Sequence, residues 1–193
     1  MPETYSKQDL RRQDFSGLDL TGADFSWCNL SNANLSNANL AGANLSRANL
    51  SRANLAHADL SRANLAHADL SRANPSRANL QNANFSSANL FAANLSRSNL
   101  RDANLTGANL FAANMSRADL PGADLSGANL FVANLSHADL TDTTLTGASF
   151  TGANLDRANR ANEDATASNR WRLVCLADLD GAAGRETVQG LPG

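Results

Sequence analysis

The side chains most capable of catalysis or metal binding are three histidines and two cysteines, and their spacing favours neither activity. His57, His67 and His137 are scattered along the chain, and Cys28 is far from Cys175. A zinc site needs three or four such ligands in one cluster, and a nucleophilic serine or cysteine needs a neighbouring base. No glycine-rich phosphate-binding loop is present. We therefore expect a non-enzymatic protein with no metal, no other cofactor and no small-molecule substrate.

Three arginines are spaced so that they could bind an anion together. Arg77, Arg97 and Arg117 recur at every twentieth position, each directly after a serine. A row of arginines could engage phosphates or an acidic protein surface. The alternative is a solvated row paired with aspartates of adjoining rows. The 10 basic and 10 acidic residues between Leu10 and Leu155 favour this alternative and make direct nucleic-acid binding the less favoured function.

Three phenylalanines have the same spacing and are the second candidate surface. Phe91, Phe111 and Phe131 each follow a leucine within nearly identical blocks of sequence. Their position predicts that they point outward, and exposed apolar patches often mark interfaces. We expect them to contact a protein partner or a second copy of the chain. Packing beneath a C-terminal helix is the structural alternative.

The elements that would position these residues follow from a period of five. Leu or Phe occupies every fifth position from Leu10 to Leu155, with breaks at Pro75 and Met115, in the motif Ala-(Asp/Asn)-Leu-(Ser/Thr)-X. Five residues advance an α-helix by about 140° beyond one full turn, and an odd spacing alternates faces in a flat strand. The pattern therefore predicts a chain that bends once per pentad, with each central leucine directed to the axis. At Pro75 we expect a local packing gap or a bend, because proline is small and has no N–H.

A longer period sets the number of sides. The three phenylalanines and also Gly107, Gly127 and Gly147 recur at every twentieth position, which is every fourth pentad. Four pentads per turn predict a coil with four faces. About 7.5 coils at a strand spacing of about 4.8 Å predict a rod roughly 35 Å long.

Over residues 8–159 these motifs closely resemble the pentapeptide-repeat family, in about thirty repeats that stay in phase. The resemblance implies an all-β fold, a right-handed quadrilateral β-helix. Some bacterial members imitate duplex DNA and bind DNA gyrase, which protects cells from quinolones. That activity needs a strongly acidic rod, and the near-neutral charge of these repeats disfavours it. The favoured function is a structural scaffold or protein-interaction module, and gyrase binding is the alternative.

The chain divides into four segments by composition. Residues 1–9 form a lead-in, 10–159 the β-helix, 160–180 a helical cap and 181–193 a flexible glycine-rich tail. Trp171, Val174 and Leu179 would form the apolar face of the cap, because a solenoid exposes unpaired backbone at its end. The segment 160–180 would then close the last coil.

Net charge, hydropathy and cysteine content indicate the expected cellular compartment and whether a membrane contact is expected. A net charge of −2 gives no global attraction to nucleic acid or to an anionic membrane. The N-terminal residues are polar, and no window approaches the roughly 18 apolar residues of a membrane helix. Two distant cysteines favour a reducing compartment. We therefore expect a cytoplasmic protein without a membrane contact.

Overall fold

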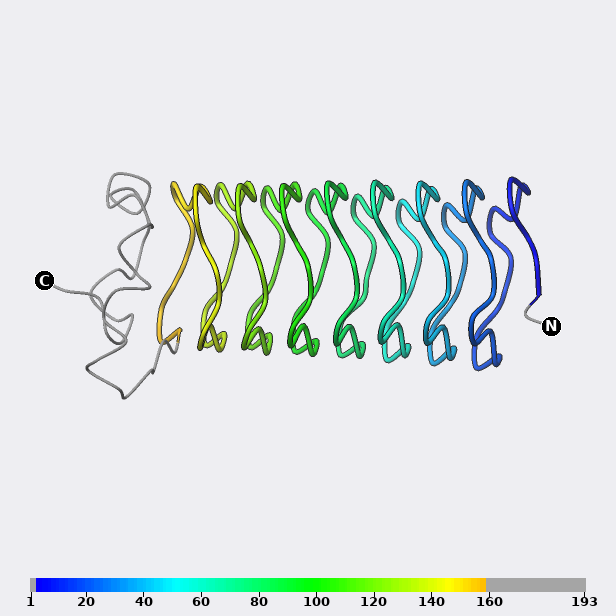
Figure 1. Cartoon of the computed structure of the whole chain (residues 1–193), viewed down its shortest axis with the longest axis horizontal. Helices are drawn as coiled ribbons and strands as arrows, with labels where there is room; N and C mark the ends of the chain where they lie inside the picture. Colours follow the sequence, from blue (N-terminus) through cyan, green and yellow to red (C-terminus); the bar gives the residue numbers. More distant parts are fainter. Residues whose placement is uncertain (1–2, 159–193) are drawn as a thin grey trace, which may run out of the picture.

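The computed structural model describes residues 3–158, which form one straight solenoid of stacked coils (Figure 1). Residues 3–158 contain no helix and no strand longer than a single bridge position. Instead, isolated parallel bridges join the residue before each central position to the residue 20 positions later, from Thr4–Asp24 to Asn134–Asn154, with one exception at Asn74. One coil is therefore four pentads long, as the longer period predicts.

A regular pentad inside the stack satisfies all five of its backbone N–H groups, as the pentad Ala43–Arg47 shows. Its alanine N–H bonds to the preceding leucine carbonyl at 2.9 Å, and its asparagine N–H bonds to the previous coil at 2.9 Å. The N–H groups of Leu45 and Arg47 bond to the next coil at 2.7 and 3.0 Å. The Ser46 N–H donates to the asparagine Oδ1 at 3.2 Å. Because no donor is left over, the period of five is also a complete hydrogen-bonding unit.

The corners of the coil are turns with left-handed backbone at the second residue after each central leucine. That residue has a φ between 51° and 71° throughout, whereas the residue before it does not have a positive φ. Together with the hydrogen bond that closes each corner, this describes a type II turn, which prefers Gly or Asn at the left-handed position. Arginine, histidine and even Val132 occupy it here, at a cost of about 1–2 kcal/mol each. The inter-coil hydrogen bond of the same residue helps to hold this conformation.

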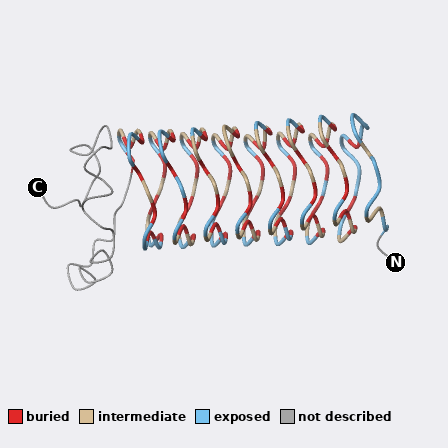
Figure 2. Cartoon of the chain, turned by 90° about the horizontal axis from the view of Figure 1, so that it is seen from above, coloured by how far each residue is buried: buried red, intermediate tan, exposed pale blue. Residues whose placement is uncertain are grey.

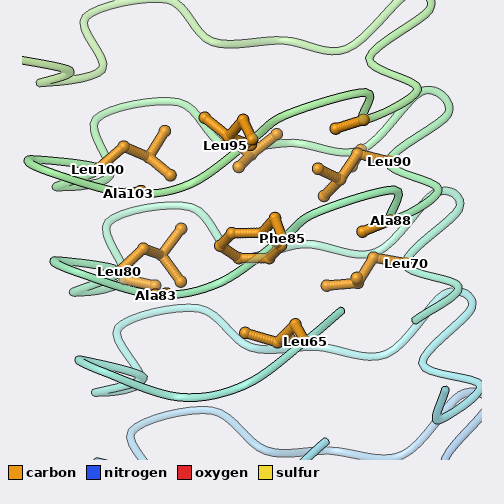
Figure 3. Close-up of a cluster of buried hydrophobic side chains, with 14 of the residues drawn as sticks. Leu65, Leu70, Leu80, Ala83, Phe85, Ala88, Leu90, Leu95, Leu100 and Ala103 are labelled. Atoms are coloured by element: carbon orange, nitrogen blue, oxygen red, sulfur yellow. The ribbon is translucent and has the colours of Figure 1, made fainter. Parts of the chain in front are cut away.

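The core consists of the central residues and the alanines two positions before them. Figure 3 shows Leu, Phe and Ala side chains from successive coils stacked inside the coil, and Figure 2 shows buried segments alternating with exposed corners. Central leucines from Leu30 to Leu135 are at most 1% exposed. From Ala23 onward the alanine position holds only small side chains, and Cys28, Ser98 and Thr143 replace alanine there while remaining buried. The buried Ser98 hydroxyl donates to the Leu95 carbonyl at 2.7 Å.

Asparagine side chains form ladders between the coils, and each ladder has a direction. The Asn54 amide donates to Asn34 Oδ1 at 3.2 Å, and Asn34 donates to Asp14 Oδ1 at 3.0 Å. An aspartate accepts but does not donate, so it suits the start of a ladder, where no acceptor is needed below. Four consecutive pentads at the N-terminal end accordingly carry an aspartate, one in each column: Asp9, Asp14, Asp19 and Asp24.

The regular coil begins within the segment 1–9, where we expected only a lead-in. Thr4 bridges Asp24, and the Tyr5 N–H donates to the Asp24 carbonyl at 2.7 Å. Tyr5 takes the place of a central leucine and stacks on Phe25 with ring centroids 4.6 Å apart. Phe15 meets both rings edge-on. These aromatic rings cover the N-terminal end of the core.

Pro75 interrupts one bridge without bending the rod. The bridge between Asn74 and Asn94 is missing because Pro75 has no N–H to donate to the Asn94 carbonyl. The adjoining hydrogen bond from the Asn94 N–H to the Ala73 carbonyl stays at 2.9 Å. Pro75 is buried, and the rod remains straight (Figure 1). Of the two expected outcomes, a packing gap or a bend, the bend does not occur, because the hydrogen bonds on either side hold the register.

The C-terminal predictions fall outside the described residues. They are the helical cap 160–180 with Trp171, Val174 and Leu179, and the tail 181–193.

Replacing Pro75 with leucine should stabilise the solenoid. Pro75→Leu restores one inter-coil hydrogen bond, which is worth about 0.5–1.5 kcal/mol, and continues the leucine column between Leu55 and Leu95. We expect a higher midpoint in thermal unfolding followed by circular dichroism. Pro121→Ser is the matched control and should not stabilise, because Pro121 occupies the first central position of a type II turn, where proline is favoured. An unchanged or lower midpoint for Pro75→Leu contradicts the argument.

The four N-terminal aspartates should make the stability of this end of the solenoid depend on pH. Hydrogen bonds from the residue two positions later lower the pKa of Asp9, Asp14, Asp19 and Asp24, with Arg11, Ser16, Thr21 and Ser26 as the donors. A lowered folded pKa contributes stability above the ordinary value of about 3.9, and that stability is lost as pH falls through the folded pKa. Thermal unfolding between pH 5 and 2 should show this loss. The fourfold Asp→Asn variant keeps the acceptor oxygens and should lose less; an equal loss contradicts the assignment.

Candidate interaction surfaces

The three phenylalanines form one continuous outward stack, called here the phenylalanine strip: Phe91, Phe111 and Phe131. Ring centroids lie 5.6 Å apart for the lower pair and 5.3 Å for the upper pair, and both interplanar angles are 18°. Stacking leaves Phe91 and Phe111 half-buried, whereas Phe131 is 38% exposed. The predicted outward orientation is confirmed for all three residues.

The local backbone explains why these rings stack. Each phenylalanine is the first residue after a central leucine, and its N–H donates to the side-chain oxygen of the preceding asparagine, as from Phe111 to Asn109 at 3.2 Å. This bond orients the same position identically on each coil. Successive coils are about 4.8 Å apart, which suits offset-stacked rings. Ala92, Ala112 and the exposed Val132 continue the apolar surface onto the corner.

The predicted arginine row lies along another corner and borders a shallow groove of about 730 Å³, called here the basic groove. Its corner residues are His57, Arg77, Arg97, Arg117 and His137. Its other lining residues include the serines directly before the arginines. No ion pair of Arg77, Arg97 or Arg117 occurs within residues 3–158. The expected pairing with neighbouring aspartates is therefore not formed there.

The two surfaces belong to adjoining faces of the same coils. Phe111 belongs to the pentad that precedes the pentad of Arg117, so the two residues lie one corner apart on the coil. Val132 and the alanines of the strip share the corner of the phenylalanines, and the face 113–115 connects that corner to the corner of Arg117. One side of the rod thus presents the apolar strip and the basic groove together on three coils, where the groove contributes Arg97, Arg117 and His137.

A third exposed group was not predicted from the sequence. Trp27 is 54% exposed, and the Arg47 guanidinium lies 4.7 Å from its ring centroid. These two residues occupy the same corner position on successive coils, so the longer period could have revealed the pair. The contact is a cation–π interaction at the surface, worth about 0.5–1 kcal/mol.

The described residues offer no grouped catalytic or metal-binding side chains. Residues 3–158 contain no cluster of three His, Cys, Asp or Glu that could hold a metal ion. His57 and His67 lie two corners apart, on opposite sides of the coil. The Cys28 thiol is buried and donates to the Tyr5 carbonyl at 2.7 Å, and burial raises its pKa. In the same part of the chain there is no helix long and apolar enough to cross a membrane.

The comparisons with known proteins agree with the repeat. The family model for pentapeptide repeats matches in 8 copies, over residues 8–32, 28–65, 58–97, 88–127 and 123–159. The chain is 33% identical to HetL, a pentapeptide repeat protein involved in heterocyst differentiation regulation in the cyanobacterium Nostoc sp. strain PCC 7120. That alignment covers 79% of this chain and 75% of HetL, with a TM-score of 0.38. No curated protein sequence matches the chain.

Two further solved structures are similar over part or most of the chain. A pentapeptide repeat protein from the cyanobacterium Cyanothece 51142 is 42% identical over 49% of this chain and 62% of its own, with a TM-score of 0.26. Full-length QnrB1, a plasmid-mediated fluoroquinolone resistance protein, is 20% identical over 82% of this chain and 87% of its own, with a TM-score of 0.41. These TM-scores are too low to support an argument from superposition.

Proposed function

Because this chain belongs to the pentapeptide-repeat family, we propose that it is a non-enzymatic scaffold that binds a protein through the phenylalanine strip. Family membership implies a right-handed β-helix, and such rods present long, rigid surfaces suited to contacts. The observation that carries the proposal is the stack of Phe91, Phe111 and Phe131, which the pentad does not require. The partner is another protein or a second copy of the chain.

The residue types in the phenylalanine strip support its role as a protein interface. Aromatic side chains are enriched at the centres of protein interfaces and contribute much of the binding energy. Rigid stacking also limits the side-chain entropy lost on binding. A strip three coils long is smaller than the roughly 800 Å² per partner of a standard interface. The partner must therefore also contact the surface around the strip, including the exposed Val132.

The remaining parts of the proposal rest on composition and burial. A non-enzymatic role is supported by the separation of the histidines and by the burial of Cys28. A reduced Cys28 fits a cytoplasmic location, which belongs to the same proposal. Neither a cofactor nor a small-molecule substrate is part of it.

Gyrase binding by imitation of DNA is the alternative, and the surface charge opposes it. A mimic of DNA must present acidic groups along the rod, whereas Arg77, Arg97 and Arg117 line one corner without carboxylate partners within residues 3–158. The four N-terminal aspartates are concentrated at one end of the rod. Such a charge distribution is unlike the uniform negative charge of a duplex.

Placing a charge in the phenylalanine strip should weaken the protein contact. Phe111→Asp breaks both ring stacks and puts a carboxylate at the centre of the apolar surface. Asp156 occupies the same position of the motif, so the turn accepts aspartate. Self-association would be followed by sedimentation velocity, and binding of another protein by quantitative recovery from native lysate. We expect a loss of at least tenfold in one of the two, on the scale of an interface hot spot.

Ser51→Asp is the matched control for this experiment. It places the same charge in the same column, two coils below the strip. It should leave both measurements unchanged. Unchanged sedimentation together with unchanged recovery for Phe111→Asp would overturn the proposed role of the strip.

The protein should leave gyrase unaffected. In a supercoiling assay at micromolar protein we expect neither inhibition of gyrase nor protection from a quinolone, because the repeats are not uniformly acidic. Clear inhibition or protection in that assay would instead establish the alternative function.

A further inference from the structure

The basic groove contains cationic groups that have no partner in the described chain. Two arginines elsewhere on the rod are paired: Arg101 with Asp119 at 3.5 Å, and Arg11 with Asp9 at 2.6 Å. Asp119 follows Arg117 closely in the sequence, yet its ion pair is with Arg101. Arg77, Arg97 and Arg117 form no ion pair with a carboxylate among residues 3–158. Their charges are therefore available to a ligand.

The face beside the groove has no acidic residue over five coils. Its pentads are 53–57, 73–77, 93–97, 113–117 and 133–137, and none contains Asp or Glu. Arg52 and Arg72 stand at the opposite corner of this face. The formal net charge of −2 thus conceals one face that is entirely neutral or basic. On the face that follows the groove corner, Asp59, Asp119 and Asp139 come two residues after His57, Arg117 and His137, whereas Asn79 and Asn99 follow Arg77 and Arg97. The excess of positive charge is therefore greatest at Arg77 and Arg97, where it raises the local concentration of an anion.

Free hydroxyl groups accompany the arginines. Within residues 3–158 the side chains of Ser76, Ser96, Ser116 and Ser136 make no hydrogen bond to another residue. By contrast, the Ser36 hydroxyl in the same column donates to Asn34 Oδ1 at 2.8 Å. At three levels the groove therefore offers a guanidinium and a free hydroxyl side by side. Both donate to oxyanions, and arginine binds phosphate in a bidentate manner.

The composition of the groove favours a phosphate chain over an acidic protein. Its lining is Ser, Asn, His and Arg, with no apolar side chain. A protein interface has an apolar centre, which this groove lacks. The lining also contains no Phe, Tyr or Trp, the larger rings that stack on nucleobases. Contacts would therefore be to a backbone of phosphates and independent of base sequence.

The geometry points to a linear polyphosphate-type anion as the ligand of the basic groove, either a single nucleic-acid strand or inorganic polyphosphate. The corner residues from His57 to His137 span four coil steps, about 19 Å at the strand spacing. Anionic groups along an extended chain would be neutralised by successive arginines. This site is separate from the phenylalanine strip and does not depend on the proposed protein contact.

Fluorescence anisotropy with the full chain tests the proposal. The probes are a labelled oligothymidylate of about 20 nucleotides and labelled inorganic polyphosphate, from about 50 to 200 mM salt. The variant is Arg77→Asn, Arg97→Asn and Arg117→Asn combined, because asparagine suits the left-handed corners. For the single strand we expect about tenfold or greater weakening at the lowest salt. The slope of log K against log salt should fall by about 2, which is roughly 0.7 for each phosphate that is no longer neutralised.

Two controls separate the groove from total charge and from protein recognition. Arg47→Asn, Arg62→Asn and Arg101→Ser remove the same charge from other corners and faces and should retain most of the binding. Labelled poly-glutamate should bind much more weakly than either phosphate chain. Binding of one phosphate chain and not the other supports the proposal and identifies the source. No binding of either chain, an equal loss in the control variant, or equal affinity for poly-glutamate overturns it.

Discussion

The parallel register between coils is the interaction on which the rest of the structure depends. Three of the five N–H groups in a pentad bond to carbonyl groups on neighbouring coils, at 2.7–3.0 Å in the pentad Ala43–Arg47. The fourth closes the corner, and the fifth is accepted by the asparagine side chain. A one-residue slip between coils would break the three inter-coil bonds of each pentad and move leucines out of the core. The repeat can therefore continue for many coils only if its length never varies.

This register also explains how the structure tolerates unfavourable residues. Arginine, histidine and valine occupy left-handed corners at many positions, and each is less suited to that conformation than glycine. The N–H of the corner residue is itself bonded to the next coil, so departure from the left-handed conformation would cost that hydrogen bond. Pro75 is tolerated for the same reason. It loses one inter-coil hydrogen bond, and the hydrogen bonds around it keep the coil in register.

The sequence predicts the core well and the surface less well, for a physical reason. A buried column requires one residue type at one spacing, so the central leucines and small alanines are predictable directly. The outward stack of Phe91, Phe111 and Phe131 followed from the same spacing. The start of the coil at Thr4 did not, because Tyr5 replaces the leucine and the preceding residues break the motif. Pairing of side chains at corners depends on rotamers, which is why the ion pair of Asp119 with Arg101 could not be foreseen.

Separation of core from surface is what makes such a rod adaptable. Only the central residue and the alanine of each pentad are consistently buried, so the corner positions can vary with little effect on packing. A residue type that recurs once per coil then forms a continuous row of side chains on one side of the rod. Aromatic rings at one column form an apolar strip, and arginines at another form a basic groove, on adjoining faces of the same coils. The total charge and the composition of the chain do not distinguish one row from another. A nearly neutral chain can therefore carry a face that has no carboxylate over five coils.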